Sequence, residues 1–227
     1  MGQSLTVPEF VLDHPLVADR VARLRDERTD RPQFRSLVAD LAGFLAYEAC
    51  RDLATRAVTV RTPLSDAAGR RVADPGPLVV PVLRAGLGML DAVLHVLATG
   101  DAAPLGLRRD ERTLEAVVYC DTVPSDLAGR TVIVCDPMLA TGGSLSFACN
   151  LAAARGAGTV MALALLAAPE GLARIARDAP HALVAVAAVD DRLDDRGYIV
   201  PGLGDAGDRL YGPPAPITGA PPPWSEG

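Results

Sequence analysis

The sequence predicts an α/β fold, with a mainly parallel twisted sheet and helices on both faces. Three runs, 78–83, 131–135 and 159–166, are continuously apolar and rich in β-branched residues, which is typical of strands buried on both faces. Segments with helical spacing of apolar residues separate these runs. Strands that alternate with helices indicate parallel pairing through helical crossovers. Because only 4% of the residues are aromatic, we expect Ala, Val and Leu to fill the core.

The length of 227 residues fits a single domain, which we place at 1–212. Its first part, about 13–56, is predicted to be a helical arm with helices at 15–28 and 32–55. The segment 213–227 is dense in proline and is predicted to be a disordered tail.

Between the arm and the first buried run we expect a short strand at 58–62 and an irregular connection at 63–76. Pro81 lies within the run 78–83, and proline normally restricts a strand to the edge of a sheet. The further elements, in chain order, are a helix ending near Leu97, strands at 103–107 and 114–119, a loop at 120–130, helices at 144–154 and 169–179, a strand at 183–189, and a glycine-rich loop at 197–207.

Composition excludes several classes of function. The net charge of −6 argues against general binding of nucleic acid, and the absence of an 18-residue apolar run argues against a membrane span. No lysine occurs, so Walker-type phosphate binding and Schiff-base chemistry are excluded. The four cysteines lack C-x-x-C spacing, which gives no indication of a zinc site or a redox dithiol. The first residues lack the pattern of a signal peptide, and we expect a cytoplasmic protein.

The strongest local signal is the run 131–144, in which a buried strand is followed by Asp136 and then by Thr141-Gly142-Gly143-Ser144 at the start of a helix. A helix start offers backbone N–H groups to an anion, and glycines allow it to approach closely. The run therefore predicts a phosphate pocket, with Asp136 facing a ribose diol or a metal-bound water. The alternative is a strand–turn–helix joint that only requires small residues.

A second strand–helix joint has a similar layout. The run 78–83 ends in Arg84-Ala85-Gly86, and a helix follows. An arginine and small residues at this point favour an anion site, because the planar guanidinium matches phosphate oxygens. An arginine that forms a salt bridge at the strand end explains the pattern equally well as an anion site.

Several stretches resemble the uracil phosphoribosyltransferases, of the type I phosphoribosyltransferase family. DPMLATGGS, from Asp136 to Ser144, resembles their phosphoribosyl-pyrophosphate (PRPP) loop, and VPVLRAGLGMLD, at 80–91, resembles their pyrophosphate loop. GYIVPGLGDAGDR, at 197–209, is similar to their uracil-binding segment, and 13–49 is similar to their N-terminal helical arm. The resemblance covers roughly 13–212, and it implies transfer of a phosphoribosyl group from PRPP to uracil, giving UMP and diphosphate.

The resemblance also implies roles for individual residues. Asp136 and Arg84 would act in catalysis, and Arg109 would reach the donor's phosphates. Position 108, often tyrosine in the family, is Arg108 here. The PRPP site would comprise Arg84, Arg109, Asp136, Pro137, Met138, Leu139, Ala140, Thr141, Gly142, Gly143, Ser144 and Asp205, and the uracil site Ile199, Gly204, Asp205 and Ala206. Magnesium would be carried by PRPP, without direct protein ligands.

Other readings remain open at this point. A non-catalytic sensor of PRPP or of a uracil nucleotide would fit the same loops, as would a transferase for another base, such as a purine. The family is commonly oligomeric, so a homodimer or higher homo-oligomer is expected. The sequence identifies no general base and leaves open whether GTP acts as an effector.

Overall fold

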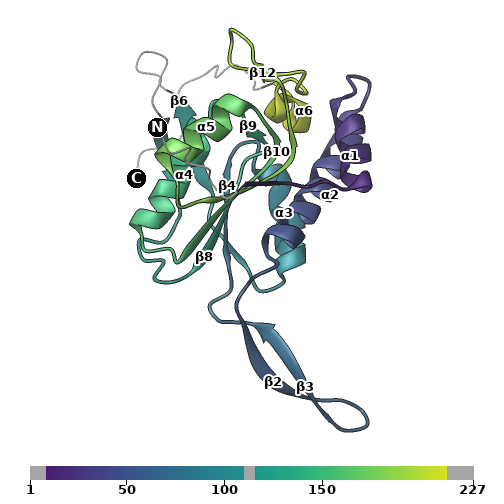
Figure 1. Cartoon of the computed structure of the whole chain (residues 1–227), viewed down its shortest axis with the longest axis vertical. Helices are drawn as coiled ribbons and strands as arrows, with labels where there is room; N and C mark the ends of the chain where they lie inside the picture. The colour runs from purple at the N-terminus through teal and green to yellow at the C-terminus, as the bar shows by residue number, and fades with distance from the viewer. Residues whose placement is uncertain (1–8, 110–115, 214–227) are drawn as a thin grey trace, which may run out of the picture.

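A mainly parallel sheet runs through the centre of the molecule (Figure 1). The computed structural model describes residues 9–109 and 116–213. The strand order is β1-β11-β10-β8-β4-β6-β7, and within it only β7 is antiparallel to its neighbour. The strands are β1 Glu9–Val11, β4 Leu78–Leu83, β5 Asp101–Ala102, β6 Leu105–Arg109, β7 Ala116–Asp121, β8 Thr131–Cys135, β9 Met138–Leu139, β10 Thr159–Ala167 and β11 Leu183–Val189. The predicted α/β fold is therefore confirmed.

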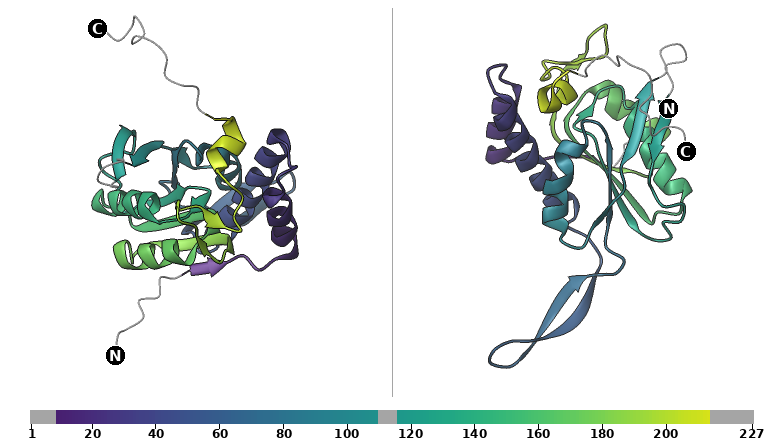
Figure 2. Two further views of the ribbon diagram at one scale, coloured as in Figure 1. Left: turned by 90° about the horizontal axis from the view of Figure 1, so that it is seen from above. Right: turned by 180° about the vertical axis from the view of Figure 1, so that it is seen from behind.

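Helices cover both faces of this sheet, and the left view of Figure 2 shows the two layers. On β4, Val79 points to one layer and Val80 to the other, because successive strand residues face opposite sides. The Val79 side packs against α1 Pro15–Arg25, α2 Arg31–Ala49, α3 Leu87–Leu97 and α6 Ala206–Tyr211, and the Val80 side against α4 Gly143–Ala154 and α5 Pro169–Asp178. Two-sided burial explains why these strands read as continuous apolar runs.

The two helices of the arm begin where the sequence favours a start. His14 caps α1, since its Nδ1 accepts from the backbone N–H of Leu16 at 3.1 Å. Asp30 caps α2 by accepting from the N–H of Gln33 at 2.8 Å. The end of the second helix was predicted wrongly. The helix ends at Ala49 rather than at 55, because the chain turns after Ala49 and already enters strand β2 at Thr55.

The segment between the arm and β4 contains a hairpin that the sequence did not indicate. β2 Thr55–Arg61 pairs antiparallel with β3 Asp66–Val72, and the hairpin stands away from the body of the molecule (Figure 1). Most of its side chains are exposed, so the burial pattern that identifies other strands is weak here. The prediction of an irregular connection at 63–76 was therefore wrong, because β3 lies within it.

Pro81 lies in an interior strand, contrary to the expectation of an edge. β4 pairs with β8 on one side, and on the other with β5 and then with β6. Pro81 falls between Val79, the last residue paired with β5, and Val82, the first paired with β6. A missing N–H is tolerated because the ladder is already interrupted there.

Several short elements were also not predicted: β1 at one edge of the sheet, β9 beside β10, the pair β12 Arg192–Leu193 with β13 Ile199–Val200, and helix α6. The last two lie within and beside the glycine-rich loop. Among the described residues, no helix is both long and apolar enough to span a membrane.

Candidate active site

Asp136 directly follows β8, at the carboxyl edge of the parallel sheet. Its backbone N–H donates to the carbonyl of Leu163 at 3.1 Å, which holds the chain against β10. Burial raises the pKa of the Asp136 carboxyl to about 7, although a hydrogen bond from the N–H of Met138 opposes the shift. A carboxyl with such a pKa at a strand end is a candidate for a site that binds a developing positive charge.

The chain after Asp136 is fixed by backbone hydrogen bonds to the neighbouring strand. The carbonyl of Pro137 accepts from the N–H groups of Leu165 and Leu166, at 2.9 and 3.1 Å. The carbonyl of Leu139 accepts from the N–H of Ala168 at 3.0 Å. These bonds place the following loop, Ala140 to Ser144, directly above the edge of the sheet.

Gly142 is the N-cap of α4, with φ of 78°. A side chain at this φ is strained, and a Cβ would lie 2.8 Å from the carbonyl oxygen of Gly171. Having no side chain, Gly142 supplies no oxygen to the N–H groups of the first turn. The start of α4 can therefore offer those N–H groups to an anion.

A cavity of about 190 Å³ lies over this loop. It is lined by Asp136, Met138, Leu139, Ala140, Thr141, Gly142, Gly143, Ser144, Leu145 and Gly197. All residues expected to hold the donor's 5′-phosphate and ribose therefore surround one space, except that Pro137 lies beneath it and is buried. Gly197 joins them from the C-terminal segment, and a Cβ on it would lie 3.7 Å from Cγ2 of Thr141.

Arg84 follows β4, the strand next to β8, and its preceding peptide bond is cis. The small residue Gly86 allows this joint to pack against the end of β8, because a Cβ on Gly86 would lie 2.3 Å from the carbonyl oxygen of Cys135. The side chain of Arg84 is half exposed, and its Nη2 lies 3.7 Å from Oδ1 of Asp208. A loosely paired, accessible guanidinium at this edge can bind a phosphate group.

The predicted base-binding residues lie on the segment that closes this edge. Ile199 and Ala206 are buried, and their side chains pack into the hydrophobic core rather than toward solvent. Gly204 is exposed with φ of 81°. Asp205 is exposed and caps α6, since its Oδ1 accepts from the N–H of Asp208 at 2.8 Å. The structure thus gives Asp205 a local role in addition to the one that resemblance implies.

Arg109 is the last residue of β6, and its side chain lies outside the described residues, as does the hairpin tip at 110–115. The neighbouring Arg108 is exposed.

The described part of the chain holds no preformed cage of protein ligands for magnesium. Among residues 9–109 and 116–213, no cluster of three or more His, Cys, Asp and Glu side chains could hold a metal ion. Asp136 and Asp205 offer separate carboxylates at the sheet edge, which suits a magnesium ion that is bound mainly by ligand phosphates and waters.

Sequence reasoning missed the contribution of α5. Gly171 in its first turn packs against the PRPP loop, because a Cβ there would lie 2.4 Å from the carbonyl oxygen of Ala140 and 2.5 Å from that of Leu139. Arg174, one turn later, lies beside Gly142 and Gly143. The available signal was a glycine inside a helix, which usually has a packing reason.

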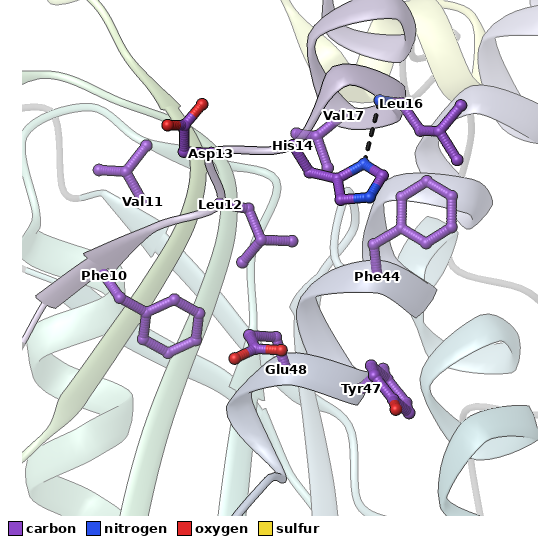
Figure 3. A pocket seen from close by; sticks show the side chains of 10 residues that line it. All are labelled: Phe10, Val11, Leu12, Asp13, His14, Leu16, Val17, Phe44, Tyr47 and Glu48. Carbon is purple, nitrogen blue, oxygen red and sulfur yellow. Dashed lines mark hydrogen bonds between the residues drawn. The ribbon is translucent and has the colours of Figure 1, made fainter.

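A larger cavity, of about 600 Å³, lies elsewhere, between β1, the start of α1 and the second half of α2 (Figure 3). Its lining is mostly apolar, with Phe10, Leu12 and Phe44 pointing into it. The His14 ring there already accepts from Leu16. This cavity contains neither a strand-end carboxylate nor a helix N-terminal glycine loop, and we assign the chemistry to the smaller one.

An acidic residue and a glycine loop at the carboxyl edge of a parallel sheet, with an arginine at the next strand end, suit a ligand that carries phosphate groups on a sugar. A solved adenine phosphoribosyl transferase from Trypanosoma brucei shares this fold, at 14% identity and a TM-score of 0.54, over 90% of this chain and 92% of that one. The family model for uracil phosphoribosyltransferase matches residues 11–213, and the chain belongs to this family.

Individual relatives agree. A uracil phosphoribosyltransferase from Kineococcus radiotolerans is 57% identical, over 89% of this chain and 97% of the relative. One from Streptomyces avermitilis is 54% identical with the same coverage. The solved structure of the AQ2163 protein from Aquifex aeolicus is 38% identical, with a TM-score of 0.85, over 90% of this chain and 98% of that chain.

Proposed function

We propose that this chain transfers the 5-phosphoribosyl group of PRPP to uracil, releasing diphosphate and forming UMP, as a pentosyltransferase of pyrimidine salvage. The observation that carries the proposal is the convergence of Asp136, the glycine loop, Arg84 and the base-binding segment on one edge of the sheet. Family membership supports uracil as the acceptor.

In this reaction the bond from ribose C1 to the diphosphate oxygen breaks, and a bond from C1 to uracil N1 forms. Positive charge develops on the ribose ring as diphosphate leaves. The ionised carboxylate of Asp136 stabilises that charge and holds the ribose hydroxyls. Such a fixed charge lowers the barrier because it is already oriented before the reaction.

The donor is held at its two phosphate ends. N–H groups and hydroxyls of Thr141 to Ser144 bind the 5′-phosphate at the start of α4. Arg84 stabilises the leaving diphosphate, and Arg109 contributes a second guanidinium. Magnesium carried by PRPP would further neutralise the diphosphate charge, and Asp205 would help to order the ion.

Uracil is read by main-chain groups of Ile199, Gly204 and Ala206. Its ring presents alternating donors and acceptors, which backbone N–H and C=O groups can match. The buried side chains of Ile199 and Ala206 support this assignment, because they hold the backbone rigidly against the core. No described side chain is assigned as the acceptor of the N1 proton.

The protein acts as a homo-oligomer in our proposal, with a homodimer as the simplest form. The projecting hairpin β2–β3 supports it, since a lone two-stranded hairpin is marginally stable in water and gains from packing on a second copy. We further propose a cytoplasmic location, which is supported by four unpaired cysteines.

The proposal is tested with a panel of bases. Purified protein, magnesium and PRPP are mixed in turn with uracil, cytosine, hypoxanthine and adenine, and diphosphate release is followed with and without GTP. Release with uracil alone is expected. Release with a purine alone contradicts the base assignment, and binding of PRPP without any release indicates a sensor.

A further inference from the structure

A partly buried ion pair joins the N-terminal arm to the base-binding segment. Asp190 follows β11, and only 3% of its side chain is exposed. Arg25, the last residue of α1, donates to both of its carboxylate oxygens, with Nη1 at 2.8 Å from Oδ2 and Nη2 in close contact with Oδ1. A two-pronged contact of this kind fixes the geometry of both groups.

The same two side chains bind both backbone polar groups of Gly202. Oδ2 of Asp190 accepts from the N–H of Gly202 at 2.9 Å, and Nη1 of Arg25 donates to its carbonyl at 2.9 Å. Arg25 and Asp190 thus hold a single peptide position from two sides.

Gly202 lies at the turn that sets the path of the base-binding segment. Its φ is +59°, and a Cβ would lie 2.0 Å from the carbonyl oxygen of Ile199. Ile199 precedes this turn and Gly204 follows it by two residues, so a displacement of Gly202 moves the backbone groups assigned to uracil.

A second arginine ties the segment to the arm from the opposite direction. Arg209 of α6 donates to the carbonyls of Leu24 and Asp26, at 2.7 and 2.8 Å, and to that of Leu203 at 3.3 Å. Its guanidinium lies 4.2 Å from the ring centroid of Phe34 on α2. The arm therefore contacts the segment on both sides of Gly204.

We propose that Arg25 and Asp190 are positioning residues for base binding, so that the N-terminal arm sets the affinity of the site for uracil. The inference rests on the proposed function. Neither residue lines the cavity over the PRPP loop. Loss of the contacts that Arg25 and Asp190 make with Gly202 should therefore weaken the binding of uracil and leave the binding of PRPP nearly unchanged.

The test compares KM for uracil with KM for PRPP in the full-length protein. The main variant is Arg25→Met/Asp190→Asn, which removes both charges together and so leaves no buried carboxylate without a cation. Arg25→Lys keeps the charge but lacks the fork that reaches Asp190 and Gly202 at once. Arg23→Met is the matched control, because Arg23 lies on the same helix in an exposed pair with Asp19.

We expect the double variant to raise KM for uracil at least about tenfold, since misplacement by ~1 Å can cost about a hundredfold. KM for PRPP should stay within about twofold, Arg25→Lys should be intermediate, and Arg23→Met should match the wild type. Thermal melting of each variant establishes that it is folded.

Unchanged KM for uracil in the folded double variant overturns the inference, and so does an equal rise in both KM values, which is what general loosening of the fold produces. A wild-type protein without uracil-dependent diphosphate release overturns the proposed function itself. The two failures are therefore distinguished by the wild-type measurement.

Discussion

At the scale of single residues, Asp136 carries a carboxyl with a raised pKa at the place where the proposed reaction develops positive charge. Burial favours its neutral form in the free protein, with a pKa of about 7. In the proposed mechanism, the ionised form is the one that stabilises a cationic ribose. Ionisation of Asp136 is therefore linked to turnover, and the carboxylate should stabilise the ribose charge only as pH rises through this pKa.

Replacing Asp136 by Asn should keep the fold and lower kcat about a hundredfold or more, because the oriented charge is lost. In the wild type, kcat/KM for PRPP should rise between about pH 6 and about pH 8 as Asp136 ionises. The Asn variant should lack that rise, and its profile serves as the control for ionisation of the substrates. A folded Asn variant with full turnover would reject the assignment.

The same pKa predicts the pH dependence of stability. Between about pH 4 and about pH 7, the unfolded chain has released this proton while the folded protein still holds it. The contribution of Asp136 to the free energy of unfolding therefore falls as pH rises across this range. The free energy of unfolding of the wild type minus that of Asp136→Asn, measured with denaturant, should fall as pH rises across this range, and a constant value would contradict the raised pKa of Asp136.

Two adjacent glycines of the PRPP loop should respond differently to alanine. A Cβ on Gly142 meets the backbone of Gly171 at a positive φ, so Gly142→Ala should cost ~1–3 kcal/mol of stability. A Cβ on Gly143 meets only the movable end of Arg174, at 3.2 Å, so Gly143→Ala should cost less. Thermal melting compares the stabilities of the two variants. A larger loss in Gly143→Ala than in Gly142→Ala would contradict the described packing of Gly142 against Gly171.

At the scale of elements, sequence reasoning succeeded where burial is two-sided. β4, β8, β10 and β11 were predicted within one residue at each end, because only fully buried strands read as short continuous apolar runs. The hairpin β2–β3 was missed because most of its side chains are exposed, and helix α6 because its six residues are too few to show helical periodicity. The positions of Arg84 and Asp136 at strand ends could also be predicted, because each directly follows such an apolar run.

Packing of α5 on the PRPP loop gives a prediction at this scale. Gly171→Ala should push α5 away from Leu139 and Ala140, lowering stability by ~1–3 kcal/mol and raising KM for PRPP. Gly69→Ala in the hairpin is the control, because its Cβ would meet only Val58, at an ordinary 3.6 Å. An unaffected KM for PRPP in Gly171→Ala would separate α5 from the donor site.

At the scale of the whole molecule, parts far apart in sequence meet at one edge of the sheet. Sequence could predict that strand ends gather there, because parallel strands share their carboxyl edge. It could not predict that Gly197 lies by Thr141, that Arg84 lies by Asp208, or that Arg25 holds Gly202. These contacts depend on the path of the mostly irregular segment 197–208, in which no periodic pattern of apolar residues indicates the backbone conformation.

The hairpin gives a prediction about assembly. Replacing 55–72 by a short glycine-rich turn should lower the molecular mass seen by light scattering to that of a monomer of 23.6 kDa less the deleted residues. The body of the protein should stay folded, because the hairpin makes few contacts with it. An unchanged oligomer would assign the interface to another surface, and a wild-type monomer would reject the proposed oligomer.

In the proposed function, one edge of the sheet binds PRPP and selects uracil. The most direct test is a competition in which wild-type protein receives limiting PRPP, magnesium and equal concentrations of uracil, cytosine, hypoxanthine and adenine. Mass spectrometry then identifies the nucleotides formed. We expect UMP alone, in an amount that matches the PRPP consumed. IMP or AMP as the main product, or no nucleotide at all, would contradict it.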